Sequence, residues 1–227
     1  MIDIDSPMFL IGLAIFPVVI LLIHIYIKDR FQREPIKLLL AALGMGMLSV
    51  LPVLFVERFL GSLNPYEGVK GALYMAFVVA GCVEEGFKLL FLYWLIWRNR
   101  HFDEYFDGIV YAVFVSMGFA MVENVMYVVS GGFSTGVLRA LLSVPAHFLF
   151  AVVMGYFFAL AKFYRDRGLN LLLAFVAPVL LHGIFDALLM VAEVSETIQG
   201  VCLTGFIIFD IILWKIGKKR MRELEGY

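Results

Sequence analysis

Long apolar runs separated by short polar segments make up most of this chain. Seven runs come close to the about 20 apolar residues that one helix needs to cross a membrane, and they lie at about residues 8–27, 36–60, 69–97, 108–129, 137–161, 169–192 and 197–217. The segments between them are short and contain no low-complexity or repeated sequence. The pattern predicts an all-α, polytopic membrane helix bundle of seven transmembrane helices, forming a single integral membrane domain over residues 1–227.

The composition supports a membrane protein. Hydrophobic residues make up 63% of the chain, charged residues make up 16%, and the mean hydropathy is +0.94. A soluble domain of 227 residues cannot bury that much apolar surface, so lipid is the expected solvent. The net charge of −1 gives no indication of a nucleic-acid partner. Cys82 and Cys202 lie in apolar runs and are expected to be free, and the acidic residues 1–5 do not resemble a cleavable signal peptide.

Basic residues lie at alternate connections between the apolar runs. The connections after the first, third, fifth and seventh runs contain Lys28, Arg30, Arg33, Lys37, Arg98, Arg100, Lys162, Arg165, Arg167, Lys215, Lys218, Lys219, Arg220 and Arg222. The opposite connections have only Arg58, Lys70 and Arg139. Basic connections stay in the cytoplasm, so the N-terminus is predicted to lie outside and the C-terminus in the cytoplasm.

Ionisable side chains inside the apolar runs indicate a functional site. The free energy of inserting one such side chain near the bilayer centre is unfavourable by about 2.5–3.5 kcal/mol, so these residues are rare in membrane helices unless they have a functional role. The third to sixth runs contain Glu84, Glu85, Lys88, Glu123, Asn124, His147, His182 and Asp186. The first, second and seventh runs have almost nothing comparable, so the costly groups are predicted to lie on four consecutive helices, in a core of about residues 70–192. Counting 1.5 Å per residue places them at a similar depth, between the midplane and the outer face.

The spacing of these residues predicts which of them share a helix face. Glu84 and Lys88 are four residues apart, Glu85 and Lys88 are three apart, and His182 and Asp186 are four apart, so each pair is expected to meet. Glu84 and Glu85 are about 100° apart around a helix and are not expected to point to one place. One glutamate is therefore predicted to act while the other orients or solvates it.

Carboxylates and imidazoles at one depth can activate water in two ways. A glutamate can act as a general base while imidazole and amide groups stabilise an oxyanion, a route that needs no cofactor. The same groups can bind a catalytic zinc ion, with ligands drawn across helices from Glu84, Glu85, Glu123, His147, His182 and Asp186. Both routes remain open at this point. A proton-coupled transporter and a non-catalytic membrane scaffold are the alternatives from other functional classes.

Four motifs, in order, resemble those of the PrsW family. They are Glu84-Glu85-x-x-Lys88, Phe119-x-x-x-Glu123-Asn124, His147 followed eight residues later by Gly155, and His182-x-x-x-Asp186. This family comprises bacterial intramembrane proteases related to the prenyl-protein (CAAX) endopeptidases and to the bacteriocin-processing membrane proteases. The resemblance covers about residues 80–190 and four predicted spans.

The resemblance implies a site-1 protease of the bacterial cytoplasmic membrane. Such an enzyme makes the first, extracytoplasmic cut in a membrane-anchored anti-sigma factor during the envelope stress response. It implies that Glu84, or Glu85 in another register, is the general base, and that His182 and Asp186 flank the oxyanion. Where the prenyl-protein enzymes have a second histidine this chain has Glu123, and where they have asparagine it has Asp186. Both departures weaken a direct copy of the water-activating glutamate–histidine pair, for which His147 is the substitute imidazole in this chain. They also raise the metal option, because they replace a base and an amide with anionic ligands.

Overall fold

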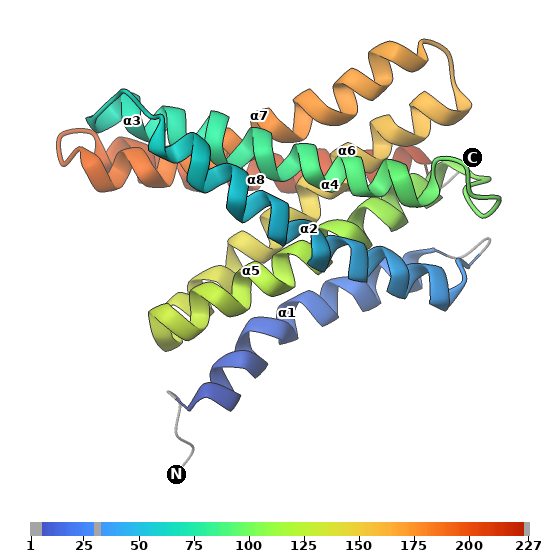
Figure 1. Cartoon of the computed structure of the whole chain (residues 1–227), viewed down its shortest axis with the longest axis horizontal. Coiled ribbons are helices and arrows are strands. Elements are labelled where there is room, and N and C mark those ends of the chain that lie inside the picture. Colours follow the sequence, from blue (N-terminus) through green and yellow to red (C-terminus); the bar gives the residue numbers. More distant parts are fainter. Residues whose placement is uncertain (1–5, 30–32, 225–227) are drawn as a thin grey trace.

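The computed structural model describes residues 6–29 and 33–224, and every regular element in that part of the chain is a helix. Residues 1–5 and Arg30, which entered the predictions above, lie outside the described residues. The helices are α1 (Pro7–Lys28), α2 (Ile36–Ser62), α3 (Gly68–Tyr74), the π-helix η1 (Met75–Gly81), α4 (Cys82–Ile96), α5 (Tyr105–Leu141), α6 (Ser143–Phe163), α7 (Arg167–Val194) and α8 (Gln199–Leu224) (Figure 1).

Five helical stretches of the described chain are long and apolar enough to cross a membrane. They are Pro7–Lys28, Ile36–Ser62, Tyr105–Phe163, Arg167–Val194 and Gln199–Leu224. The predicted third span is divided among α3, η1 and α4, and the predicted fourth and fifth spans both fall within Tyr105–Phe163. The all-α membrane bundle is therefore confirmed, whereas the count of seven spans and the orientation stay predictions.

The long helix α5 reverses direction at Gly132. This residue has a φ of 76° and a ψ of −166°, a conformation that glycine adopts without steric cost. The guanidinium Nε of Arg139 donates a hydrogen bond of 2.7 Å to Oδ1 of Asn124, fifteen residues earlier. In a straight helix these residues would be about 22 Å apart. The chain beyond Gly132 therefore folds back along the preceding turns, and the reversal lies between the predicted fourth and fifth spans.

The helices cross near the middle of the bundle and spread into two arms toward one side (Figure 1). In Figure 1, α1, α5 and the start of α6 diverge from the arm that contains α3, α4, α7 and α8. At the other end, the Lys162 ammonium donates to the carbonyl of Trp97 at 2.7 Å, and the Tyr105 hydroxyl donates to the carbonyl of Phe163 at 3.1 Å. The basic connections predicted to be cytoplasmic lie at this end, so the arms separate toward the opposite side.

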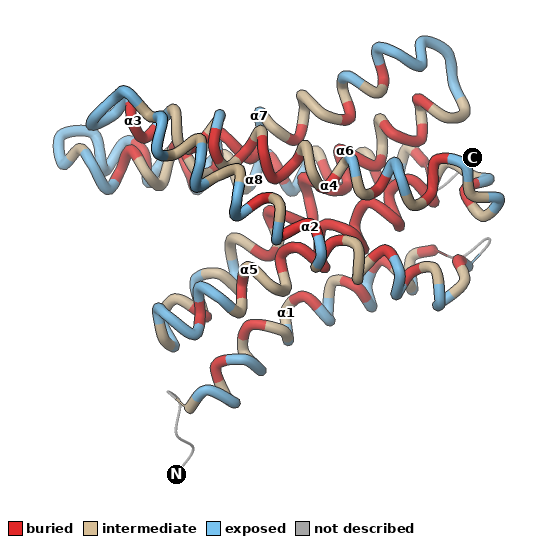
Figure 2. The backbone as a smooth tube through the Cα atoms, in the orientation of Figure 1, coloured by how far each residue is buried: buried red, intermediate tan, exposed pale blue. Residues whose placement is uncertain are grey.

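The buried core lies where α5 and α6 cross. Figure 2 shows buried residues concentrated in these two helices. Their backbones lie so close together that a Cβ atom added to Gly155 would lie 2.3 Å from the carbonyl oxygen of Gly108. The glycine of the third sequence motif thus allows the close packing that places α6 against α5. Cys82 and Cys202 are free, as expected.

Candidate active site

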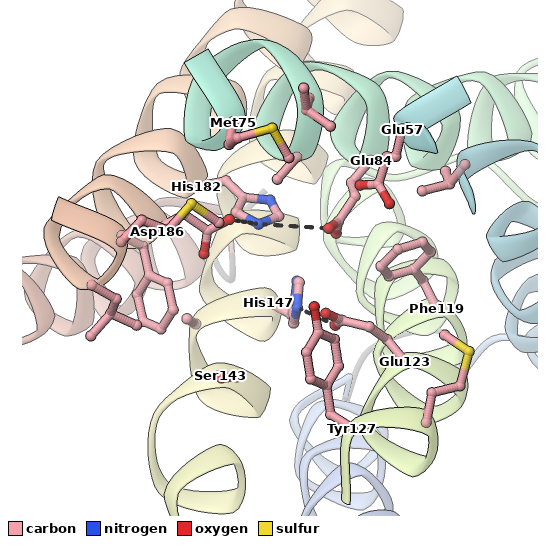
Figure 3. A pocket seen from close by; sticks show the side chains of 18 of the residues that line it. Glu57, Met75, Glu84, Phe119, Glu123, Tyr127, Ser143, His147, His182 and Asp186 are labelled. Carbon is pink, nitrogen blue, oxygen red and sulfur yellow. Dashed lines mark hydrogen bonds and ion pairs between the residues drawn. The ribbon is translucent and has the colours of Figure 1, made fainter. Parts of the chain in front are cut away.

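A cavity of about 870 Å³ lies between the two arms, and ionisable side chains from five helices line it (Figure 3). The acids and imidazoles on its wall are Glu57, Glu84, Glu123, His147, His182, Asp186 and Glu193. The rings of His147 and His182, from two different helices, are 5.3 Å apart between centroids. The costly residues of the predicted core therefore converge on one place.

The ammonium of Lys88 holds the two glutamates of α4 together. Its Nζ lies 3.0 Å from Glu84 Oε2 and 2.7 Å from Glu85 Oε1, and the lysine is fully buried. Its Nζ also lies 3.3 Å from His147 Nδ1 and 4.2 Å from the centroid of the Phe119 ring. Lys88 does not line the cavity. It is therefore the internal counter-ion of the site, placed behind the cavity wall.

The expectation that Glu84 and Glu85 point to different places was wrong in one respect. Both carboxylates reach the same ammonium, because the direction of Lys88 on the helix lies between the directions of the residues three and four positions earlier. Only Glu84 lines the cavity, however, whereas Glu85 is fully buried behind it. One glutamate therefore faces the cavity and the other lies behind it, and the division into an acting and an orienting glutamate stays a prediction.

Glu85 orients the imidazole of His182. The Nδ1 atom lies 2.9 Å from Glu85 Oε1, while Nε2 lies 3.3 Å from Asp186 Oδ2 and 4.0 Å from Glu84 Oε1. The ring of Phe150 stacks on the imidazole at 5.0 Å. A buried carboxylate at Nδ1 sets the tautomer and rotation of a histidine, so that Nε2 is presented to the cavity.

A second carboxylate–imidazole pair lies across the cavity. The Nε2 atom of His147 is 3.0 Å from Glu123 Oε2, and Arg139 Nη2 is 2.9 Å from the same oxygen. Since lysine only donates hydrogen bonds, His147 Nδ1 accepts from Lys88 and Nε2–H donates to Glu123. Asn124 does not line the cavity. Its amide donates to the carbonyl of Ala14 on α1 and accepts from Arg139, so its contacts position the arginine.

Sequence reasoning missed Glu57 and misjudged Arg139. Glu57 of α2 lines the cavity with Glu84, so the statement that the second span contributes nothing comparable was wrong. The signal was present as an acid inside an apolar run. Arg139 was counted as a charge of an outer connection, but the reversal at Gly132 brings it into the cavity wall beside Glu123.

The donor atoms of the site suit a divalent metal ion. Glu84, Glu85, His147 and His182 are buried, and one donor atom of each lies within 4.8 Å of the others. The Lys88 ammonium contacts three of these four residues and so occupies the space between them, and a metal ion would have to lie on the cavity side of Glu84 and His182. There, Glu84 Oε1, His182 Nε2 and Asp186 Oδ2 are separated by 4.0 and 3.3 Å. The 3.3 Å between His182 Nε2 and Asp186 Oδ2 matches the spacing of two ligands on a tetrahedral zinc ion with bonds of about 2.0–2.1 Å, and Glu84 Oε1, which lies 4.0 Å from Nε2, would have to move closer to become the third ligand.

Comparison with known proteins identifies the family. The model of the PrsW family of intramembrane metalloproteases matches residues 34–214. The chain belongs to the PrsW family. Proteins named protease PrsW from Clostridioides difficile (strain 630) and Geobacillus kaustophilus (strain HTA426) are 38% and 35% identical to it, with 95% and 96% of this chain covered and 90% and 93% of theirs. The Bacillus subtilis (strain 168) protease PrsW is 32% identical, with 96% of both chains covered. No solved structure matches the chain.

Membership of the PrsW family decides between the functional classes. The chain is an intramembrane protease of a bacterial cell membrane, in agreement with its apolar helices, and the transporter and scaffold alternatives are set aside. The family is one of metalloproteases, which agrees with the donor set around Glu84 and His182.

Proposed function

We propose that this PrsW-family enzyme cuts a single-span, membrane-anchored protein in the cavity between its two arms. The observation that supports the proposal is the meeting of Glu84, His182 and Asp186 at one cavity inside an apolar bundle. Each such residue is costly in a membrane, and a purely structural network does not require a cavity of about 870 Å³ beside it. That space accommodates water and an extended peptide segment, the two reactants of hydrolysis.

The chain's own residues suffice to bring water and a peptide bond together. Glu84 faces the cavity and acts as the base that removes a proton from water. His182 lies between two carboxylates, so in the absence of a metal its two ring nitrogens both donate, and Nε2–H is placed to stabilise an oxyanion. Lys88 donates a hydrogen bond of 3.0 Å to Glu84 from behind, which holds the carboxylate in place in an apolar surrounding.

A divalent metal ion such as zinc would be held by Glu84, His182 and Asp186. When bound, it supplies Lewis acidity, which polarises a peptide carbonyl and makes water more nucleophilic. Glu85 would keep the Nδ1–H of His182 and leave Nε2 to face the cavity. Glu57 and Glu123 would then be the carboxylates on the cavity wall that accept and return protons.

The position of the cavity supports a cut on the outer side of the membrane. We propose seven spans, with the N-terminus outside and the C-terminus in the cytoplasm. The cavity lies where the arms diverge, away from the basic end of the bundle. With that basic end in the cytoplasm, the peptide bond is cut in the outer half of the bilayer. Such a cut is the first step in releasing a sigma factor from a membrane-anchored anti-sigma factor, which is the proposed substrate class.

Cleavage by purified enzyme tests the assignment. The full chain is reconstituted in lipid vesicles with a membrane-anchored anti-sigma factor, and product is followed by gel electrophoresis. Glu84→Gln and His182→Ala are expected to insert normally and to lose product by at least about 100-fold, as for removal of a base or an oxyanion donor. Glu196→Gln, an exposed position before α8, removes the same charge away from the cavity and should keep full activity. Undiminished cutting by both cavity variants would contradict the proposal.

The same assay separates the metal from the metal-free route. Loss of cleavage in a chelator, with recovery on addition of zinc, is expected if the cavity-facing donors bind a metal. Cleavage that continues in the chelator would instead favour water activated by Glu84 alone.

A further inference from the structure

A second groove joins the active-site cavity and extends along α8. It has a volume of about 820 Å³ and lies between the end of α5, the start of α6, the end of α7 and one face of α8. Five residues line both the groove and the cavity, and these are Tyr127, Arg139, Ser143, Leu189 and Glu193. The groove and the cavity are therefore adjacent and share one wall.

The groove has the dimensions and the surface of a helix-binding site. Leu203, Ile207 and Ile211 are spaced four residues apart and form an exposed apolar stripe along α8, and Leu138 faces the groove from the end of α5. Its volume equals roughly two turns of an α-helix taken as a cylinder about 10 Å across. Within a bilayer the backbone of a single bound segment must satisfy its own hydrogen bonds, so a helix is the expected occupant.

Asp210 is an acid in this otherwise largely apolar groove. It lies one turn after Ile207 and five residues before Lys215, which places it about 7.5 Å inside the span from the basic end. Among the described residues, no hydrogen bond or ion pair is found for its carboxylate, which is partly exposed to the groove. The neighbouring cation Arg139 is already bound to Glu123 and Asn124. An acid without a partner at this depth is costly, and a positively charged ligand would remove that cost.

We propose that the groove binds the membrane-spanning helix of the substrate, and that Asp210 pairs with a lysine or arginine in it. The proposal rests on the proposed function for the identity of the occupant. It defines a substrate class: single-span proteins with a basic residue in the half of the helix nearer the basic end of the enzyme. The other end of the bound helix then lies at the shared wall of groove and cavity, where its last turn must unwind to reach Glu84.

A binding experiment tests the groove without requiring proteolysis. The full chain, with photoreactive benzoylphenylalanine at Ile207, is placed in phosphatidylcholine vesicles with a synthetic Leu/Ala peptide that has one spanning helix of about 20 residues. One peptide has a lysine at the depth of Asp210, and its twin has norleucine there. The control position is Ile208, which is exposed on α8 but does not line the groove. Cross-linking of the lysine peptide at Ile207 and not at Ile208 is expected.

Charge exchange tests the proposed pairing. Asp210→Asn should reduce cross-linking of the lysine peptide at least about tenfold, as for a lost hydrogen bond to a charged group, and should leave the norleucine peptide unchanged. Asp210→Lys should instead capture a twin peptide with glutamate at that position. Equal capture of all peptides by the wild type, or cross-links only to lipid or to a second copy of the chain, would overturn the proposal.

An activity measurement keeps this inference separate from the proposed function. On a substrate that the wild type cuts, Asp210→Asn should raise KM about tenfold with little change in kcat, because Asp210 contacts the substrate away from the reacting atoms. Ile208→Asn, which adds the same amide on the other face of α8, should change neither constant. If the wild type is active and the KM of Asp210→Asn is unchanged, the groove proposal is contradicted and the proposed function is not. Absence of any cleavage by the wild type contradicts the proposed function and leaves the cross-linking result to decide the groove.

Discussion

Replacing Lys88 with methionine removes the ammonium that compensates the glutamates of α4 from behind the cavity wall. Methionine keeps an unbranched side chain that fills the same space. The ammonium contacts at 3.0 Å to Glu84 and 2.7 Å to Glu85 are lost, together with the 3.3 Å contact to His147. Lys88 and Glu85 are fully buried behind the cavity wall, so water cannot take the place of the missing charge beside Glu85 without opening the bundle.

The expected loss of stability follows from two independent estimates. A hydrogen bond to a charged group contributes about 1.5–3 kcal/mol, so two of them contribute about 3–6 kcal/mol. Removing one partner of a buried ion pair costs about 3–5 kcal/mol, because an uncompensated charge stays behind. The free energy of unfolding of Lys88→Met should therefore fall by about 3–6 kcal/mol. A second substitution, Glu85→Gln, removes one of the two stranded charges and should recover at least about 2 kcal/mol of that loss.

Reversible unfolding in mixed micelles measures these changes. The wild type, both single variants and the double variant are titrated with denaturing detergent and followed by tryptophan fluorescence, and a double-mutant cycle gives the coupling energy. Lys70→Met makes the same change at an exposed position in the first turn of α3 and should alter stability by less than about 0.5 kcal/mol. The reasoning fails if Lys88→Met loses less than about 1 kcal/mol, or if the Lys88 and Glu85 substitutions are simply additive.

Four further substitutions test other parts of the structure. A Cβ at Gly183 would lie 2.2 Å from Cδ1 of Phe77 on η1, so Gly183→Ala should force α7 and η1 apart. This variant should lose about 1–3 kcal/mol of stability and lower kcat/KM at least about tenfold. Gly168 has open space around it, so Gly168→Ala should instead stabilise α7 by up to about 1 kcal/mol in the same detergent titration. Glu57→Gln should lower cleavage at least about tenfold while leaving membrane insertion unchanged, and full activity would remove this carboxylate from proton transfer. Burial raises the pKa of Glu34, in the connection before α2, above its ordinary value of 4.5. The folded state therefore holds this proton more tightly, and stability should fall as the pH rises from about 4.5 through the raised pKa. Glu34→Gln should flatten that slope in unfolding titrations at several pH values.

Part of the site could be predicted because helix periodicity and membrane energetics act locally. The pairing of Glu84 with Lys88 and of His182 with Asp186 follows from a spacing of four residues, and both contacts occur. The convergence of acids and imidazoles followed from their similar depth in successive spans. Sequence spacing, however, does not define the rotation of one helix relative to another. The sequence therefore could not predict that Glu85 faces His182.

Other parts depended on the path of the chain. A reversal at a single glycine moves Arg139 from an apparent connection to a position beside Glu123, because only glycine readily adopts a φ of 76° there. Glu57 stands out in the sequence as an acid inside an apolar run, but helix packing alone decides that it lines the same cavity as Glu84.

The amino-acid sequence by itself determined that the protein lies in a lipid membrane, that it is helical, and which ionisable residues lie inside its apolar runs. Each of these conclusions follows from the transfer free energies and the spacing of single residues. The tertiary structure alone decided which of those residues face the cavity, such as Glu84, and which lie behind it, such as Lys88 and Asn124. The reason is that the direction of a side chain depends on the rotation and crossing of neighbouring helices, and these are determined by packing between residues far apart in the chain.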